Sequence, residues 1–318
     1  MRTQAENVIR EVEKVIAGKR EVIEKIMIAL LAEGHILLDD VPGVGKTTLA
    51  TALSSAVGLE FRRIQFTPDV LPSDITGFSM YEKESGAFVY RPGLLHQVNL
   101  VLGDEINRAS SKTQSALLEA MEEQQVTVDG NTYPMEKPFT VIATQNSVGT
   151  AGTQFLPYAQ MDRFLVQLSI GYPDYESQMT MLRNRQGENP LKSVSCILSK
   201  EKLIAMQQEV RSVTVKDGIL DYITRLTMAS RTHGAVAVGI SPRGALFITR
   251  TAKARAYMEG RDYVTGEDVQ AVFRDVCIHR VLLKEGEMEY TVSRVLDELL
   301  KKTETPDHHS RFQGIMRK

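Results

Sequence analysis

The apolar residues of this chain follow two kinds of pattern, and the change between them divides the sequence. From residue 3 to residue 33 they recur at helical spacing with a break at Ala17-Gly18, which predicts two amphipathic helices. Short apolar or alternating runs then predict the strands of a buried sheet, at 36–38, 60–66, 99–103, 138–146 and 165–170. Between these strands, helical patterns are predicted at 46–53, 94–98 and 110–124. Beyond residue 174 helical spacing returns, with helices predicted at 175–187, 199–212, 216–232, 241–259, 265–283 and 290–303.

Strands alternating with helices, followed by helices alone, predict an α/β domain with a parallel sheet and a second, all-helical domain. A length of 318 residues fits two domains. We place the first at 1–171, a linker at 172–190 that includes Pro173-Asp174, and the helical domain with its tail at 191–318. Two β-hairpins are predicted as excursions from the first domain, near 77–90 and near 125–137.

Composition narrows the class of protein. An apolar fraction of 42% is enough for ordinary cores, and 38 basic against 40 acidic residues exclude a nucleic-acid-binding polycation. Cys196 and Cys277 lie in apolar settings and are expected to be reduced core residues. No apolar run approaches the roughly 20 residues of a membrane span, and no signal-peptide pattern opens the chain. We therefore expect a cytoplasmic protein without a transmembrane segment.

The stretch from 36 to 48 has the features of a phosphate-binding loop. An apolar strand is followed by a glycine loop, by Lys46 and Thr47, and then by a helix. Glycines let backbone N–H groups close around a phosphate, and the helix N-terminus adds partial positive charge. We expect Lys46 to reach the β- and γ-phosphates and the Thr47 hydroxyl to bind Mg²⁺. The predicted nucleotide-binding residues here are Pro42, Gly43, Val44, Gly45, Lys46, Thr47 and Thr48.

Two features adjoin this loop. Asp40 stands where the strict motif has glycine, and we expect it to adopt a glycine-like backbone conformation that aspartate tolerates better than most residues. Val15, Ile16 and Gly18, at the break between the first two helices, would lie near the nucleotide base if the loop holds the phosphates. The alternative is a plain helix–helix turn.

A second chemical stretch ends the strand at 99–103. Asp104 and Glu105 follow it at the edge where ligands bind in open α/β sheets. Asp104 is expected to hold Mg²⁺ through water, and Glu105 to orient and deprotonate the attacking water. Asn146 ends the strand at 138–146 beside the same edge, where it could hydrogen-bond the γ-phosphate or the water.

Together these motifs resemble those of AAA+ ATPases, and more narrowly of the MoxR family. Single positions that carry the resemblance are Lys46, Asp104, Glu105, Asn146, Arg163 and Arg243. Longer matching stretches lie at 41–47, 67–77, 104–109, 112–123 and 143–146. The chain departs from the usual family pattern at Asp40, at Ser147 and at Leu94-Leu95-His96.

The resemblance implies an αβα sandwich with a helical lid, in a ring that is usually a hexamer with ATP and Mg²⁺ between subunits. By motif match, Lys46 and Thr47 belong to Walker A, Asp104 and Glu105 to Walker B, and Asn146 is sensor 1. The hairpins near 77–90 and 125–137 match the helix-2 insert and the pre-sensor-1 hairpin, which reach the central pore in related rings.

Two arginines complete the implied site. Arg163 matches the arginine finger that acts on the neighbouring subunit's nucleotide, and Arg243 matches sensor 2 of the lid. A positioned arginine accelerates phosphoryl transfer by about 10³- to 10⁵-fold, because it stabilises charge that develops on the γ-phosphate. Each arginine has the alternative of a structural pairing with a carboxylate.

Three functions fit these features. The first is an Mg²⁺-dependent ATPase ring that remodels protein partners, among them von Willebrand factor A domain proteins, which would be separate chains. The second is a nucleic-acid motor of the replicative-helicase type, which the non-basic hairpin tips at Glu82-Lys83-Glu84 and Asp129-Gly130-Asn131 disfavour. The third is a nucleotide-gated scaffold with little turnover, which the presence of Glu105 and Asn146 disfavours.

Overall fold

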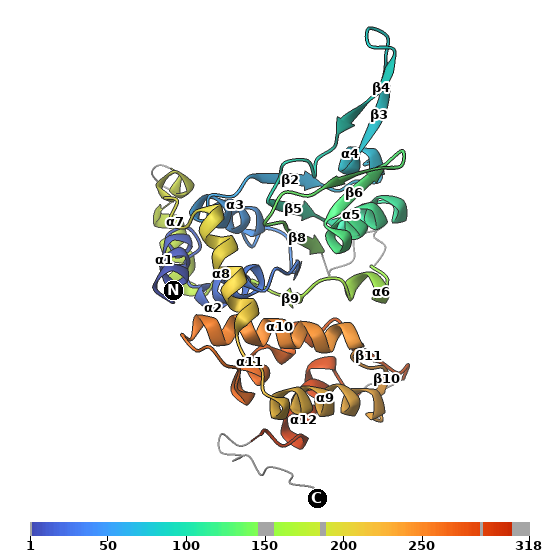
Figure 1. Ribbon diagram of the computed structural model, residues 1–318. Helices are drawn as coiled ribbons and strands as arrows, with labels where there is room; N and C mark the ends of the chain where they lie inside the picture. The colour runs from blue at the N-terminus through green and yellow to red at the C-terminus, as the bar shows by residue number, and fades with distance from the viewer. Residues whose placement is uncertain (1, 146–155, 185–188, 287–288, 307–318) are drawn as a thin grey trace, which may run out of the picture. The chain divides into compact units, whose positions relative to one another are not determined.

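The computed structural model describes residues 2–145, 156–184, 189–286 and 289–306 of the chain (Figure 1). It divides into two compact units, Met1–Val210 and Arg211–Lys318, which are described separately below.

The first unit is built on a five-stranded sheet in the order β2-β5-β8-β1-β9. The strands are β1 (Ile36–Asp39), β2 (Phe61–Gln65), β5 (Leu100–Asp104), β8 (Thr140–Gln145) and β9 (Val166–Leu168). All four neighbouring pairs are parallel, which confirms the predicted parallel sheet. Their carboxyl ends therefore meet at one edge, with Gln65 opposite Asp104 and Asp39 opposite Gln145.

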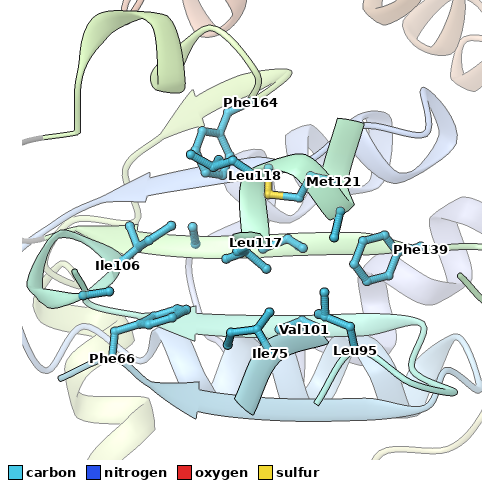
Figure 2. Packing of buried hydrophobic residues seen from close by; sticks show 14 of the residues in the cluster. Phe66, Ile75, Leu95, Val101, Ile106, Leu117, Leu118, Met121, Phe139 and Phe164 are labelled. Carbon is cyan, nitrogen blue, oxygen red and sulfur yellow. The ribbon is translucent and has the colours of Figure 1, made fainter. Parts of the chain in front are cut away.

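Helices cover the two faces of this sheet. The predicted pair before the first strand is α1 (Arg2–Glu13) and α2 (Arg20–Leu31), and α1 packs on α3 (Lys46–Ala56), which contacts β5. Figure 2 shows the core on the other side, where Leu117, Leu118 and Met121 of α5 (Ser111–Glu123) meet Val101 of β5. Alternate residues of the central strands thus face opposite helical layers, which is the αβα sandwich expected from the sequence.

Two hairpins extend the first unit. The first, β3 (Gly77–Glu82) with β4 (Ala87–Pro92), projects from it beyond α4 (Pro72–Thr76) (Figure 1). The second is β6 (Gln125–Val128) with β7 (Asn131–Pro134). The rings of Tyr90 and Tyr133, one from each hairpin, stack with centroids 3.9 Å apart. The structure thus contains both hairpins that the sequence predicts.

The helix predicted at 94–98 is wrong, because this segment forms a turn. The backbone N–H groups of Leu94 and Leu95 donate to the carbonyls of Asp74 and Ile75, at 2.9 and 3.1 Å. Gln97 has a φ of 52°, which no right-handed helix contains. The N–H groups at the start of this segment therefore bond to residues 74 and 75 rather than within a helix.

The first unit ends later than the predicted linker. The short helix α6 (Tyr158–Met161) precedes β9. After β9 come α7 (Tyr175–Asn184), the short helix η2 (Pro190–Ser193) and α8 (Lys200–Ser212). Contacts with earlier helices hold this region: Ser195 N–H donates to Glu11 at 2.9 Å, and Gln207 donates to the carbonyl of Leu30 at 2.8 Å. The division into units consequently falls after Val210 rather than within 172–190.

The second unit consists mainly of α9 (Asp217–Thr232), α10 (Pro242–Met258), α11 (Gly266–Cys277) and α12 (Val292–Lys302). It also contains the antiparallel pair β10 (Val236–Val238) and β11 (Leu282–Leu283), so the expected all-helical composition is corrected here. The helix predicted at 265–283 ends at Cys277, and the following residues turn back so that Lys284 N–H donates to the carbonyl of Ala235.

No helix in the described ranges of the chain is long and apolar enough to cross a membrane.

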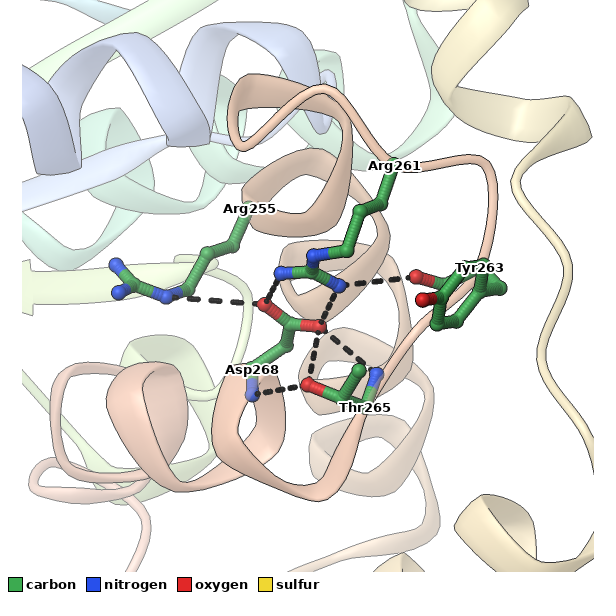
Figure 3. Close-up of polar contacts among 5 residues, drawn as sticks. All are labelled: Arg255, Arg261, Tyr263, Thr265 and Asp268. Atoms are coloured by element: carbon green, nitrogen blue, oxygen red, sulfur yellow. Dashed lines mark hydrogen bonds and ion pairs between the residues drawn. The ribbon is translucent and has the colours of Figure 1, made fainter. Parts of the chain in front are cut away.

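A buried carboxylate of α11 binds the loop that joins α10 to α11 (Figure 3). Asp268, 1% exposed, accepts two hydrogen bonds from the guanidinium of Arg261, at 2.6 and 2.7 Å. It also accepts from the backbone and hydroxyl of Thr265, which caps α11 in return. Burial raises the pKa of Asp268, but the donors, Arg261 foremost, outweigh burial and hold that pKa below its ordinary value.

We expect Asp268→Asn to lower the free energy of unfolding of the second unit by about 3 kcal/mol. The reason is that the variant leaves the partly buried guanidinium of Arg261 without its counter-charge. In the wild-type protein, the stabilisation by the Asp268–Arg261 ion pair is fully present above about pH 4. It is lost as the pH falls through the lowered pKa of Asp268. Hydrogen–deuterium exchange of the full chain would measure it at the amides of α11. Glu267→Gln, at the exposed neighbouring position, is the control, and equal protection in the two variants would contradict the prediction.

Candidate functional site

The predicted phosphate-binding loop joins β1 to α3. Gly43 and Gly45 have φ values of 84° and 94°, a region that glycine occupies without strain. Gly45 directly precedes Lys46, the first residue of α3, so the backbone N–H groups of the first helical turn face the loop. Thr47 and Thr48 also lie in this first turn, and Pro42 is exposed at the loop entrance. The local geometry is that of an anion-binding helix N-terminus.

Lys46 is buried, and its ammonium donates to the backbone carbonyl of Asp40 at 2.8 Å. Burial lowers the pKa of Lys46, and the carboxylates of Asp40, Asp104, Asp39 and Glu105 act in the opposite direction. Lys46 therefore interacts electrostatically with the Asp104-Glu105 pair.

Asp40 has a role that the sequence reasoning missed. It was expected to adopt a glycine-like backbone conformation, but it is not among the residues with positive φ, so that expectation is wrong. Its carboxylate instead accepts hydrogen bonds from the Ser169 hydroxyl at 3.0 Å, the Gly171 N–H at 3.1 Å and the Ile170 N–H. A side chain is needed at this position because it binds the segment that follows β9.

Asp104 ends β5 and is buried. Thr144 of β8 donates its hydroxyl to Oδ1 at 3.3 Å, and Arg63 of β2 donates Nε to Oδ2 at 2.6 Å. Asp104 thus has a partner on each oxygen, one from each neighbouring strand. Its oxygens and the Thr47 hydroxyl are the hard donors that Mg²⁺ prefers.

Glu105 has a φ of 57°, so the chain turns sharply directly after the strand. Its backbone N–H donates to the Thr144 hydroxyl at 2.9 Å. Its carboxylate accepts from Gln65 at 3.0 Å and from Arg108 at 2.8 Å. The candidate base is therefore held by side chains from β2 and from the short helix η1 (Ile106–Arg108).

Sequence reasoning did not find Arg63, Gln65, Arg108 or Thr144. Arg63 and Gln65 alternate along β2, and alternate residues of a strand share one face. Their partners become visible only once β2 is known to pair with β5, which no local pattern in the sequence reveals.

A cavity of about 380 Å³ opens beside the loop. Val15 and Ile16 line it together with Gly43, Val44, Gly45 and Thr48. Gly18 does not line it; a Cβ at this glycine would lie 1.9 Å from the Ser177 hydroxyl, so Gly18 allows α7 to approach. The remaining lining residues are Ala17, Lys19, Tyr172, Pro173, Ser177, Gln178 and Met181.

The remaining predicted residues are Arg163, Arg243 and Asn146. Arg163 forms an ion pair with Glu122 of α5 at 3.0 Å, the kind of carboxylate pairing considered as its alternative. Arg243 lies in the first turn of α10 in the second unit, where Ser241 caps the helix by accepting from the Gly244 N–H at 3.0 Å. Asn146 lies outside the described residues. The roles of all three stay predictions.

Comparison with known proteins places this geometry in a class. Residues 35–166 match the model of the ATPase family associated with various cellular activities (AAA), and residues 228–299 match the AAA lid domain. A putative ATPase from Cytophaga hutchinsonii has the same fold, with a TM-score of 0.89, 38% identity and 96% of each chain covered. The chain is an AAA+ protein with a nucleotide-binding core and a helical lid.

Two curated relatives narrow the class further. Chaperone MoxR1 of Mycobacterium tuberculosis is 39% identical over 92% of this chain and 80% of its own length. The uncharacterized protein YeaC of Bacillus subtilis is 46% identical over 86% of each chain. The chain belongs to the MoxR family of AAA+ ATPases.

We expect Asp40→Gly, which restores the strict loop motif, to lower the free energy of unfolding by about 2–3 kcal/mol. The reason is that the variant loses charge-assisted hydrogen bonds to residues 169–171. Denaturant unfolding would measure the change, with Asp69→Gly, at an exposed loop position, as the control for the glycine itself. An Asp40→Gly protein as stable as this control would refute the anchoring role.

Proposed function

We propose that this chain is an Mg²⁺-dependent ATPase that hydrolyses ATP to ADP and phosphate. The carrying observation is that Lys46, at the head of α3, lies in the electrostatic field of Asp104 and Glu105 at the end of β5. A phosphate-binding helix N-terminus next to a carboxylate pair is what phosphoryl transfer from a nucleoside triphosphate requires. The cavity beside Gly43–Gly45 offers an apolar wall, from Val15 and Ile16, for the nucleotide base.

Each residue of the site has a role in this proposal. Lys46 binds the β- and γ-phosphates, and Thr47 with Asp104 holds Mg²⁺. Bound there, Mg²⁺ neutralises charge on the phosphate oxygens. Glu105 accepts the proton of the attacking water, and Asn146 and Arg243 contact the γ-phosphate or the water. Because Glu105 accepts hydrogen bonds from Gln65 and Arg108, it must exchange one of these partners for the water before it can act as the base.

We propose further that the chain assembles as a ring, a hexamer by family resemblance, with Arg163 acting on the nucleotide of the next subunit. The relative named Chaperone MoxR1 supports protein partners, and von Willebrand factor A domain proteins are the class that we propose. Exposed Phe78, Tyr81 and Phe88 on the projecting hairpin suit an apolar polypeptide better than a phosphate backbone. This arrangement would operate in the cytoplasm.

We expect Glu105→Gln to bind ATP with near wild-type affinity but to lose at least about 100-fold in turnover, since general-base catalysis contributes about 10²–10⁴. Phosphate release and fluorescent-nucleotide binding on the same samples would test this. Glu119→Gln, an exposed carboxylate on α5, is the control. Retention of normal turnover by Glu105→Gln would remove Glu105 as the base.

Arg163→Ala is expected to bind nucleotide and to lose about 10³-fold or more in turnover, because the finger stabilises the transition state. Mixing it with Glu105→Gln subunits should restore part of the activity, since each intact arginine can then serve an intact base. Absence of rescue would favour the structural role given by the Glu122 ion pair.

Light-scattering mass and ATP turnover, measured together over a range of protein concentrations, would separate the candidate functions. Turnover per subunit that rises with ring formation and ignores single-stranded DNA supports the remodelling ring. Turnover independent of concentration contradicts the trans arginine, and strong stimulation by DNA favours a nucleic-acid motor.

A further inference from the structure

The guanidinium of Arg63 occupies a position that the proposed function leaves unexplained. Arg63 belongs to β2, the edge strand of the sheet, and is paired with Leu102, two residues before Asp104. Its side chain runs along the sheet toward the carboxyl edge and donates Nε to Oδ2 of Asp104 at 2.6 Å. This distance is that of a charge-assisted hydrogen bond.

The two partners differ in exposure. The side chain of Asp104 is 10% exposed and that of Arg63 is 48% exposed. A carboxylate removed from water needs a counter-charge, whereas a half-exposed arginine regains hydration when it swings away. The ion pair therefore joins a fixed buried acceptor to a donor that can leave at low cost.

Both oxygens of Asp104 have partners, Thr144 on Oδ1 and Arg63 on Oδ2. Thr144 is a neutral, buried donor that also accepts from the Glu105 N–H, so it belongs to the frame of the site. Arg63 instead carries a full positive charge at the carboxylate that is proposed to hold Mg²⁺.

We infer that Arg63 is the counter-ion of Asp104 in the cation-free site and competes with the divalent cation for this carboxylate. The inference rests on the proposed function, since it assumes that a cation–nucleotide complex binds here. Arg63 is a positioning residue in this scheme: it acts on Asp104 and touches no reacting atom.

The same side chain reaches the candidate base through one intermediate. Arg63 Nη2 donates to Gln65 Oε1 at 3.2 Å, and Gln65 Nε2 donates to Glu105 Oε2 at 3.0 Å. Departure of Arg63 from Asp104 therefore also removes the donor that orients the Gln65 amide. Cation binding and the freedom of Glu105 are linked through a single side chain.

The test measures binding rather than turnover. The dissociation constant of a fluorescent, non-hydrolysable ATP analogue is determined with EDTA and with saturating Mg²⁺, and the ratio of the two constants reports how strongly the cation promotes binding. The affinity of Mg²⁺ for the analogue itself cancels between variants. In Arg63→Gln we expect this ratio to rise about tenfold, because a positive charge beside the cation site has been removed.

The neighbouring arginine provides the matched control. Arg62 precedes Arg63 on β2 and contacts the carbonyl of Leu94 at 3.4 Å, so Arg62→Gln removes the same charge from the strand without touching Asp104. Its ratio should equal that of the wild type. Arg63→Lys keeps a positive charge and should stay close to the wild type, and circular dichroism of each variant checks folding.

The remaining outcomes overturn the inference. An unchanged ratio in Arg63→Gln means that the ion pair does not compete with the cation. Weaker binding by the same factor in EDTA and in Mg²⁺ means that Arg63 contacts phosphate instead. Failure of the wild-type protein to bind the analogue under either condition would contradict the proposed function itself, which is a distinguishable result.

Discussion

The site depends on the hydrogen bonds of one residue, Asp40, at the end of β1. Its carbonyl accepts from the Lys46 ammonium, its N–H donates to Gln145 at the end of β8, and its carboxylate binds the segment 169–171 after β9. Three strand ends and the phosphate-binding loop are thereby fixed to one another. Because parallel strands present only their ends at this edge, such cross-links decide whether the functional groups keep their spacing. A glycine at this position would keep the two backbone hydrogen bonds but would lose the carboxylate that binds the segment 169–171.

A balance of charge follows from that arrangement. Lys46 is buried, which lowers its pKa, and nearby carboxylates offset the effect of burial. The carboxylates of Asp104 and Glu105 need hydrogen-bond donors, and besides the buried Thr144 hydroxyl these are the side chains of Arg63, Gln65 and Arg108. Arg63 and Arg108 are more exposed than the carboxylates to which they donate, so they can rearrange while the carboxylates stay in place. A charged ligand can therefore enter the site by displacing exposed donor side chains, without movement of the carboxylates.

The sequence predicted those features that depend on neighbouring residues along the chain. Apolar runs and helical spacing were sufficient for the parallel sheet, and the strand–glycine–lysine order was sufficient for the loop. Contacts set by strand order were not predictable, since the partners of Arg63 and Asp40 are more than 40 residues away in the chain. The turn at 94–97 was missed for the same reason, because its N–H groups bond to residues 74 and 75. The strands β10 and β11 are too short to show the alternation of apolar and polar residues by which a strand is recognised in a sequence.

The two hairpins show how the same core supports projecting parts. An isolated two-stranded hairpin is at best marginally stable in water. Here the Tyr90 ring stacks on Tyr133 of the other hairpin, and its hydroxyl donates to the Thr76 carbonyl at 2.6 Å at the end of α4. Burial raises the pKa of the Tyr90 hydroxyl above its ordinary value. The base of each hairpin is therefore fixed by the other, while Phe88 near the tip stays 74% exposed. Stability at the base and apolar exposure at the tip are separate properties of one hairpin, so the tip can be specialised for a partner without weakening the fold beneath it.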